Sequence, residues 1–120
     1  MSEKCYLVLR AGGTLEVHLG ERGKPRPTLE DAQRHVGGYI ERFETPTLPE
    51  GWSAFCNEEG KLKELPPNTV ATMLLPAYAD DIIVGDVFIC GVDDGGEFSW
   101  LGADAAEKFK EVFHARTNEV

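Results

Sequence analysis

Three cations lie close together in the segment Glu21–Pro27, directly before a predicted helix. Arg22, Lys24 and Arg26 outnumber one acid, Glu21, so the segment carries a local charge of +2. The chain as a whole has a net charge of −9, so the rest of it carries −11. Amides at the start of a helix and the helix dipole also attract anions. The pattern predicts either a site for a phosphate or a carboxylate, or a solvated loop whose charges bind no ligand.

Aromatic and amide side chains supply the other candidate contacts. Tyr39 follows two glycines, which either leave room for a flat ligand or mark close packing, a kink or the end of a helix. Trp52 and Trp100 are core residues or, at the ends of strands, one wall of a pocket. Asn57 and Asn68 either form hydrogen bonds with the polar edge of a ligand or serve as turn and capping residues. The candidate ligand-binding set is Arg22, Lys24, Arg26, Tyr39, Trp52, Asn57 and Asn68.

The sequence contains no motif typical of catalysis or metal binding. His18, His35 and His114 stand alone, and the three cysteines are more than 30 residues apart. A metal site needs several converging ligands, and the sequence has neither a nucleophile elbow nor a phosphate-binding loop. We therefore predict no metal, no cofactor and no catalytic residue, and we expect a binding protein rather than an enzyme. The cysteines are expected to be free thiols.

Composition narrows the class of protein further. A length of 120 residues fits one domain, and 42% hydrophobic with 28% charged residues is typical of a folded chain. The acidic balance argues against direct nucleic-acid binding through phosphates. No apolar run approaches the roughly 20 residues of a membrane helix, and the N-terminus lacks a signal-peptide core. We expect a cytoplasmic protein, in the host cytoplasm if a phage encodes it, without membrane contact.

Hydrophobic spacing and turn residues predict the elements that position these side chains. Strand patterns occur at Cys5–Leu9, Leu15–Leu19, Trp52–Cys56, Lys61–Lys63, Asp80–Cys90 and Glu97–Leu101. Helical spacing occurs at Thr28–Phe43, Thr69–Leu75 and Ala103–Arg116, the first packing on the sheet through Leu29, Val36 and Ile40. The order ββαββαββα predicts one α+β domain over residues 1–120. Its sheet should be antiparallel or mixed, of about six strands, with two main helices and one short helix packed on it.

Four sequence blocks resemble a family of small domains of unknown function from bacteriophages, actinobacteria and mobile elements. They are VGGYIE at Val36–Glu41, CNEEGKL at Cys56–Leu62, LPPN at Leu65–Asn68 and VGD at Val84–Asp86. The resemblance spans about Thr28 to Trp100 and implies no known chemistry. What it implies is context, because small proteins of this kind often serve as accessory or anti-defence factors.

Two hypotheses about function follow. In the first, a non-enzymatic phage or mobile-element accessory protein binds and sequesters a small anionic, nucleotide-type signal as an anti-defence factor. We expect it to be a homo-oligomer, because pockets are often built between subunits. In the alternative, an acidic, DNA-mimic-like inhibitor occupies a basic cleft on a host defence protein. A small structural or assembly factor is a third interpretation that the sequence leaves open.

Overall fold

The computed structural model describes residues 3–117, with side chains to residue 113, so the side chain of His114 lies outside the described part. Every strand pairing is antiparallel, and five strands follow the order β2-β1-β5-β4-β3 while β6 pairs with β5. The strands are β1 Cys5–Leu9, β2 Leu15–Leu19, β3 Ile40–Phe43, β4 Trp52–Asn57, β5 Val87–Val92 and β6 Phe98–Ser99. The helices are α1 Leu29–Val36, the short α2 Thr69–Thr72, and α3 Ala105–Thr117. The predicted α+β class, strand number and helix set are confirmed.

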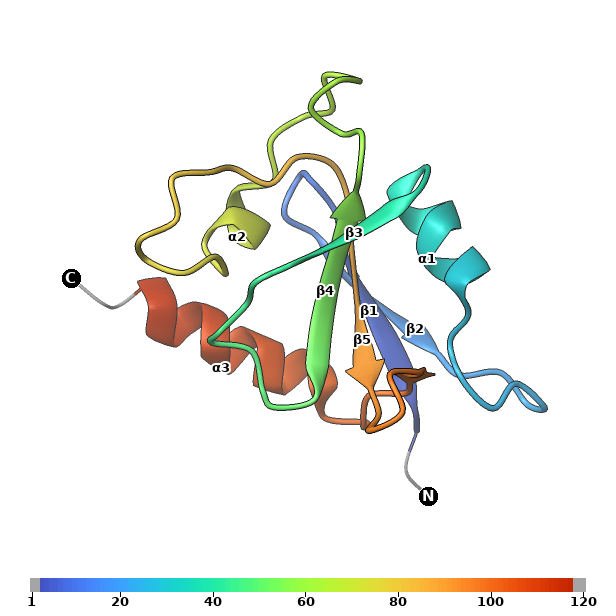
Figure 1. The fold of residues 1–120 in the computed structure, drawn as a ribbon. Coiled ribbons are helices and arrows are strands. Elements are labelled where there is room, and N and C mark those ends of the chain that lie inside the picture. The colour runs from blue at the N-terminus through green and yellow to red at the C-terminus, as the bar shows by residue number, and fades with distance from the viewer. Residues whose placement is uncertain (1–2, 118–120) are drawn as a thin grey trace.

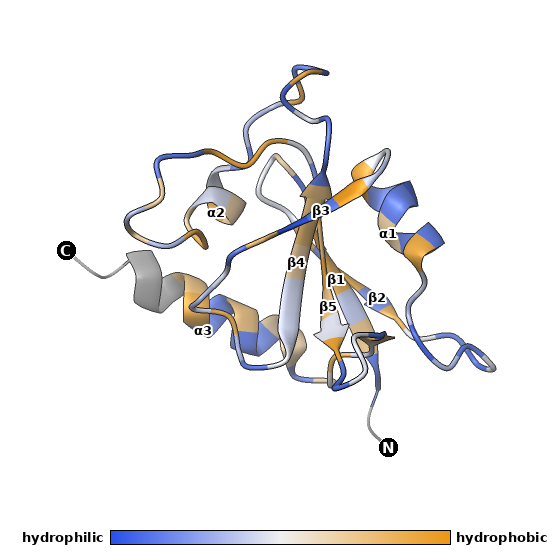
Figure 2. Ribbon diagram, viewed as in Figure 1, coloured by the Kyte–Doolittle hydropathy of each residue, from blue (hydrophilic) through white to orange (hydrophobic). Residues whose placement is uncertain are grey.

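Helices cover both faces of the sheet, α1 on one side and α2 with α3 on the other (Figure 1). Successive side chains of a strand point to opposite faces, so β1 serves two cores. Leu7 packs with Phe109 of α3 in one core, and Val8 packs with Ala32 of α1 in the other. Figure 2 shows hydrophilic residues along the loop between β2 and α1, most of which are exposed, while Pro27 at the end of the loop is buried.

The first helix is shorter than its spacing predicts. It ends at Gly37, whose φ of 82° is the left-handed conformation that glycine adopts most readily at a helix end. The prediction that this helix continues to Phe43 is wrong, because Ile40–Phe43 forms the edge strand β3. The predicted packing through Leu29 is also wrong, since Leu29 is exposed and Ala32 takes the buried position.

Two other strands were predicted at the wrong positions, although the predicted order of strands and helices along the chain is right. Lys61–Lys63 lies in a series of turns, and β3 is the strand that the prediction omitted. The predicted strand from Asp80 begins only at Val87, because the preceding residues pair elsewhere. Pro67 and Val84 form an isolated antiparallel bridge, and the backbone amide of Gly85 donates to Pro66. The segment before β5 is therefore tied to the connection that leads into α2.

Candidate functional site

Two cations of the predicted set border a hollow of about 500 Å³ at one end of β2. Its apolar wall combines the indole of Trp100 with Leu19 and Pro25. Its cations are Lys4, Arg22 and Lys24, and the acids Glu3 and Glu21 also lie at it. The cationic loop therefore meets an aromatic side chain, but that side chain is Trp100 rather than Tyr39 or Trp52.

Lys24 is held by a buried acid at the start of α1. Its ammonium lies 2.7 Å from Asp31 Oδ2, and the Asp31 side chain is 3% exposed. The carboxylate also accepts from the Thr28 amide, while the Asp31 amide donates to Thr28 Oγ1. Burial alone would raise the pKa of Asp31, but the bonds from Lys24, Thr28 and Arg34 lower it to about 2. The helix N-terminus, which the sequence offers as an anion site, already holds this carboxylate.

Arg26 points to a different part of the surface from Arg22. Its Nη1 lies 3.5 Å from Asp93 Oδ2 and 3.9 Å from Glu97 Oε2, in the turn between β5 and β6. It lines a separate hollow of about 270 Å³. Arg22, by contrast, has no acidic partner within 4.0 Å among residues 3–117. Of the three predicted cations, Arg22 is the one whose charge is available to a ligand in the larger hollow.

The predicted aromatic contacts do not reach the cationic loop. Tyr39 follows the C-terminal end of α1, whereas the loop precedes its N-terminal end. Trp52 packs against the core that α3 covers, on the opposite face of the sheet from α1. It lines another hollow with Arg42 and the connection between β3 and β4. The single site that combines the loop with Tyr39 or Trp52 is therefore not formed.

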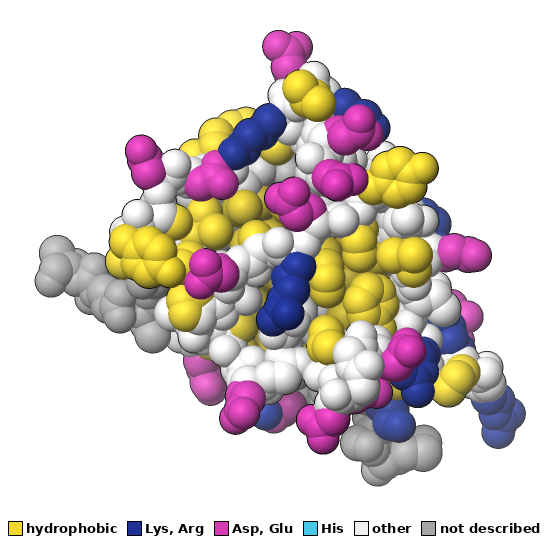
Figure 3. All heavy atoms as spheres, in the orientation of Figure 1, with side chains coloured by type: hydrophobic (Ala, Val, Ile, Leu, Met, Phe, Trp, Pro, Cys, Tyr) yellow, Lys and Arg dark blue, Asp and Glu magenta, His cyan; other side chains and the backbone are white. Residues whose placement is uncertain are grey.

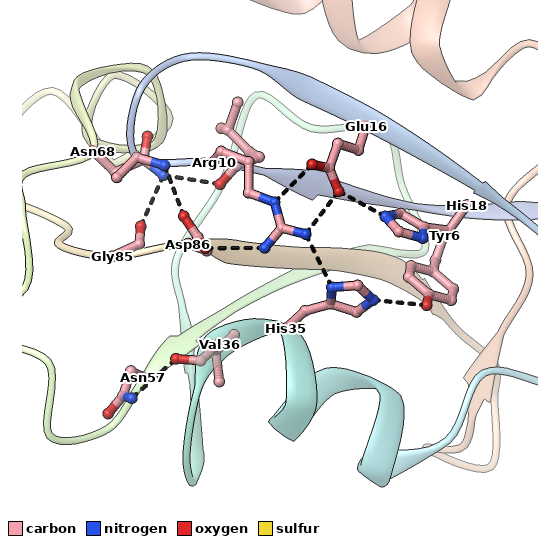
Figure 4. Close-up of polar contacts among 12 residues, drawn as sticks. Tyr6, Arg10, Glu16, His18, His35, Val36, Asn57, Asn68, Gly85 and Asp86 are labelled. Atoms are coloured by element: carbon pink, nitrogen blue, oxygen red, sulfur yellow. Dashed lines mark hydrogen bonds and ion pairs between the residues drawn. The ribbon is translucent and has the colours of Figure 1, made fainter.

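Asn57 and Asn68 are buried and hydrogen-bonded to the backbone (Figure 4). Asn57 Nδ2 donates to the Val36 carbonyl over 3.0 Å, and its Oδ1 accepts from the Glu59 amide. Asn68 Nδ2 donates to the carbonyls of Leu9 and Gly85, and its Oδ1 accepts from the Ala71 amide as the cap of α2. Their turn and capping roles account for these bonds, and neither residue is brought to the hollow beside Trp100.

A cluster of polar side chains that was not predicted lies between β1, β2 and α1. We call it the histidine cluster, and its members are Tyr6, Arg10, Glu16, His18, His35 and Asp86 (Figure 4). Arg10 lies at its centre. Two guanidinium nitrogens donate to Glu16 over 2.8 and 2.7 Å, and Nη1 donates to Asp86 over 2.9 Å. The bonds from Arg10, followed by that from His18, lower the pKa of Glu16 to about 2. These ion pairs tie β1 to β2 and to the start of β5.

His35 adopts one tautomer in this cluster. Arg10 Nη2 lies 3.3 Å from His35 Nδ1, and because a guanidinium only donates, Nδ1 accepts. The proton is then on Nε2, which donates to the Tyr6 hydroxyl over 3.0 Å. Burial lowers the pKa of His35 below its ordinary value, and the charges of His18 and Arg10 lower it further. His35 is therefore neutral at neutral pH.

The two histidine rings meet, although they are 17 positions apart in the sequence. Their centroids are 4.5 Å apart, and the His18 ring stacks on Tyr6 at 5.0 Å and 5°. The prediction that His18 and His35 stand alone is wrong. A signal for half of the cluster exists in the sequence, because the turn at Ala11–Gly13 pairs Tyr6 with His18 and Val8 with Glu16. No comparable signal places His35 against them.

The histidine cluster also supports the wall of the hollow. Tyr6 lies between His18 and Trp100, whose ring is 6.2 Å from Tyr6 and inclined by 11°. On the β2 side the indole lies against Gly20, where a Cβ would be in ordinary contact with the ring at 3.5 Å and closer, at 3.3 Å, to the Lys4 carbonyl. Trp100 thus packs against Tyr6 and Gly20 where it lines the hollow.

The thiols are buried. Burial raises the pKa of Cys56 to about 11, with a further contribution from Glu41, and burial raises that of Cys90 to about 12. Both are protonated at neutral pH, which makes them poor nucleophiles. Within residues 3–117, no group of three or more His, Cys, Asp or Glu side chains is arranged to hold a metal ion. No helix in that range is long and apolar enough to cross a membrane.

Fold and site define an α+β domain with an antiparallel sheet, a cation-and-tryptophan hollow and a half-buried histidine cluster. The family model described as Domain of unknown function (DUF3846) matches residues 6–114, a range that includes the histidine cluster, Arg22 and Trp100. The chain belongs to this family. The match confirms the expected membership of a family of domains of unknown function. Neither the search of curated proteins nor that of solved structures found a match.

Proposed function

We propose that the domain binds a small anionic ligand of the nucleotide type in the hollow between Arg22 and Trp100. The observation that carries this proposal is the position of an arginine without an acidic partner, among the described residues, beside an indole held by Tyr6. A guanidinium binds phosphate oxygens through paired hydrogen bonds, and an indole stacks on a flat base. The guanidinium of Arg22 suits the phosphate end of a nucleotide, and the indole of Trp100 suits the base at the other end.

The size and charge of the hollow fit such a ligand. Its volume of about 500 Å³ falls in the usual range for small-molecule sites. Lys4 adds a second cation, and Lys24 reaches the hollow while bound to Asp31. Glu3 and Glu21 at the same hollow oppose a ligand of high negative charge. We therefore favour a ligand with one or two phosphates.

Binding without chemistry is consistent with the side chains at the hollow. Its described lining contains no His, Cys, Ser, Thr or Tyr. The described part of the hollow thus lacks the usual hydroxyl, thiol and imidazole groups of catalysis, and only its Glu and Lys side chains are of types that also act as acids, bases or nucleophiles. This composition supports sequestration of the ligand rather than its turnover. We extend the proposal to the role of a phage or mobile-element accessory protein that removes a nucleotide signal from a host defence system in the cytoplasm.

The alternative, an acidic inhibitor that mimics DNA, has less support. On the face shown in Figure 3, Asp and Glu side chains are spread out, with Lys and Arg between them and hydrophobic side chains exposed. A mimic of DNA needs closely spaced negative charge over a long surface. Its binding to a basic protein would weaken steeply with salt, because exposed charges are screened.

Calorimetric titration with mono-, di- and cyclic nucleotides tests the proposal. We expect Arg22→Gln to weaken binding about tenfold, the effect of losing one charge-assisted contact of about 1.4 kcal/mol. Arg42→Gln is the matched control, because it removes the same charge at the exposed edge strand β3. Binding that Arg22→Gln leaves unchanged, or an absence of nucleotide binding to the parent, would refute the proposal.

A further inference from the structure

The edge strand β2 carries an exposed apolar row. Val17 is 46% exposed and Leu19 is 57% exposed, and within residues 3–117 the strand pairs only with β1. Proteins usually protect such an edge with charges, prolines or a covering segment, because its free backbone groups pair with other strands. An uncovered edge strand of five residues that exposes Val17 and Leu19 is a surface suited to strand addition.

The direction of the free backbone groups follows from two hydrogen bonds beside the ladder. The Gly20 amide donates to the Lys4 carbonyl over 2.7 Å, and the Arg10 amide donates to the Thr14 carbonyl over 2.8 Å. In an antiparallel pair, successive residues alternate between bonding to the partner strand and pointing away from it. Even-numbered residues of β2 therefore bond to β1. The amides and carbonyls of Leu15, Val17 and Leu19 point outward.

We propose that two copies of the chain pair antiparallel through β2, about a twofold axis at Val17. This register places Val17 opposite Val17 of the second copy and Leu15 opposite Leu19 of the second copy, so all outward amides and carbonyls of β2 find partners. It also places the carboxylate of Glu16 opposite the imidazole of His18 of the second copy. Such an interface is self-complementary, as twofold symmetry requires.

Charge selects this register over its neighbours. A shift of two residues in one direction brings the carboxylate of Glu16 opposite its own copy, and a shift in the other direction brings His18 opposite its own copy and away from Glu16 of the second copy. Like charges directly opposite each other on paired strands are destabilising. The other edge of the sheet fails by the same criterion, since twofold pairing about the middle of β3 sets Glu41 or Arg42 opposite itself. The occupant of the β2 edge is thus a second copy of this chain.

This inference is independent of the proposed ligand, because the pairing uses only β2. It does place the hollow close to the interface, since Leu19 and Gly20 line the hollow and Gly20 lies opposite Thr14 of the second copy. The protein can therefore be found to dimerise without binding nucleotide, or to bind nucleotide as a monomer, and each result is distinct from the other.

Sedimentation equilibrium on the full chain without nucleotide tests the dimer. Val17→Pro removes an amide that points to solvent in the single copy, so it spares the β1 ladder while deleting bonds across the axis. Val17→Thr is the control, because it keeps the amide and the β-branched side chain. At a chain concentration of about 100 μM we expect the parent and Val17→Thr to dimerise, because interfaces of modest area are weak. We expect Val17→Pro to dimerise at least tenfold more weakly than the parent.

A second variant separates loss of the interface from loss of the fold. If circular dichroism finds Val17→Pro unfolded, Val17→Lys replaces it, since it sets two ammonium groups opposite each other across the axis while leaving every backbone amide in place. A parent that remains monomeric at about 100 μM would overturn the proposal, as would a folded Val17→Pro or Val17→Lys variant that dimerises as tightly as the parent.

Discussion

The ammonium of Lys24 lies 2.7 Å from the carboxylate of Asp31, a side chain that is 3% exposed at the start of α1. This pair joins the cationic loop to the helix that packs on the sheet. It separates the roles of two loop cations, since Lys24 neutralises a buried acid while Arg22 points its charge at the hollow. Lys24 therefore ties the loop to the start of α1, whereas Arg22 lines the hollow without an acidic partner among the described residues.

Removing the buried acid should change the stability of the protein in acid. The pKa of Asp31 is lowered from 3.8 to about 2, so the stability it contributes is complete above its ordinary pKa and is lost as the pH falls toward 2. This loss amounts to about 2 kcal/mol between pH 5 and pH 2. Urea unfolding across this range should show a smaller decline for Asp31→Asn than for the parent. An equally small decline for Asp94→Asn, at an exposed turn acid, would contradict this assignment.

His35 should make the protein less stable just below neutral pH. Its folded pKa is lowered, so its contribution is complete above the unfolded value of about 6.5 and is lost as the pH falls below it. Imidazole nitrogen shifts measured by NMR should report an Nε2–H tautomer and a midpoint below 6.5 for His35. A protonated His35 at pH 6.5, or a proton on Nδ1, would contradict the contacts assigned to Arg10 and Tyr6.

Asn68 should be more important for folding than for binding. Asn68→Ala removes three buried hydrogen bonds, two of them to the carbonyls of Leu9 and Gly85, a loss of about 3 kcal/mol in the free energy of unfolding. Asn68→Asp retains the acceptor that caps α2 but points a carboxylate at the same two carbonyls. Chemical denaturation should therefore find both variants strongly destabilised. If Asn68→Asp were as stable as the parent, the cap alone would explain the residue.

Burial distinguishes two neighbouring apolar residues that the sequence places in one strand. Val87 is fully buried in β5, so Val87→Asp should unfold the domain, because a buried unpaired carboxylate costs several kcal/mol. Ile82 is half-exposed before β5, and Ile82→Asp should melt within a few degrees of the parent. Thermal melts followed by circular dichroism compare the two. Similar melting temperatures for both variants would mean that the buried part of this segment is misplaced.

Local patterns predicted much of the fold. The apolar run at Cys5–Leu9 and the alternation at Leu15–Leu19 gave both strands with the right bounds, and Asn68 was correctly read as the cap of α2. The helix over Thr28–Phe43 failed because Ile40 and Phe43 continue the helical spacing of apolar residues across Gly37. Spacing alone does not reveal that the chain reverses there into an edge strand.

The site was harder to predict than the fold because it depends on contacts between distant segments. Arg22 was identified from local charge, but its aromatic neighbour is Trp100, which reaches the hollow through the bridge between Cys5 and Leu101. His35 meets Tyr6 only because α1 packs across β1. Neither contact can be predicted from the spacing of residues along the chain.

Fluorescence of Trp100 during nucleotide titration tests the central claim most directly. The chain has two tryptophans, and Trp52→Phe removes the one on the opposite face, leaving Trp100 as the only indole. We predict saturable quenching of this signal as a base stacks on the ring, with a midpoint about tenfold higher when Arg22→Gln is added. Calorimetrically detected nucleotide binding that leaves Trp100 fluorescence unchanged would contradict the proposed site.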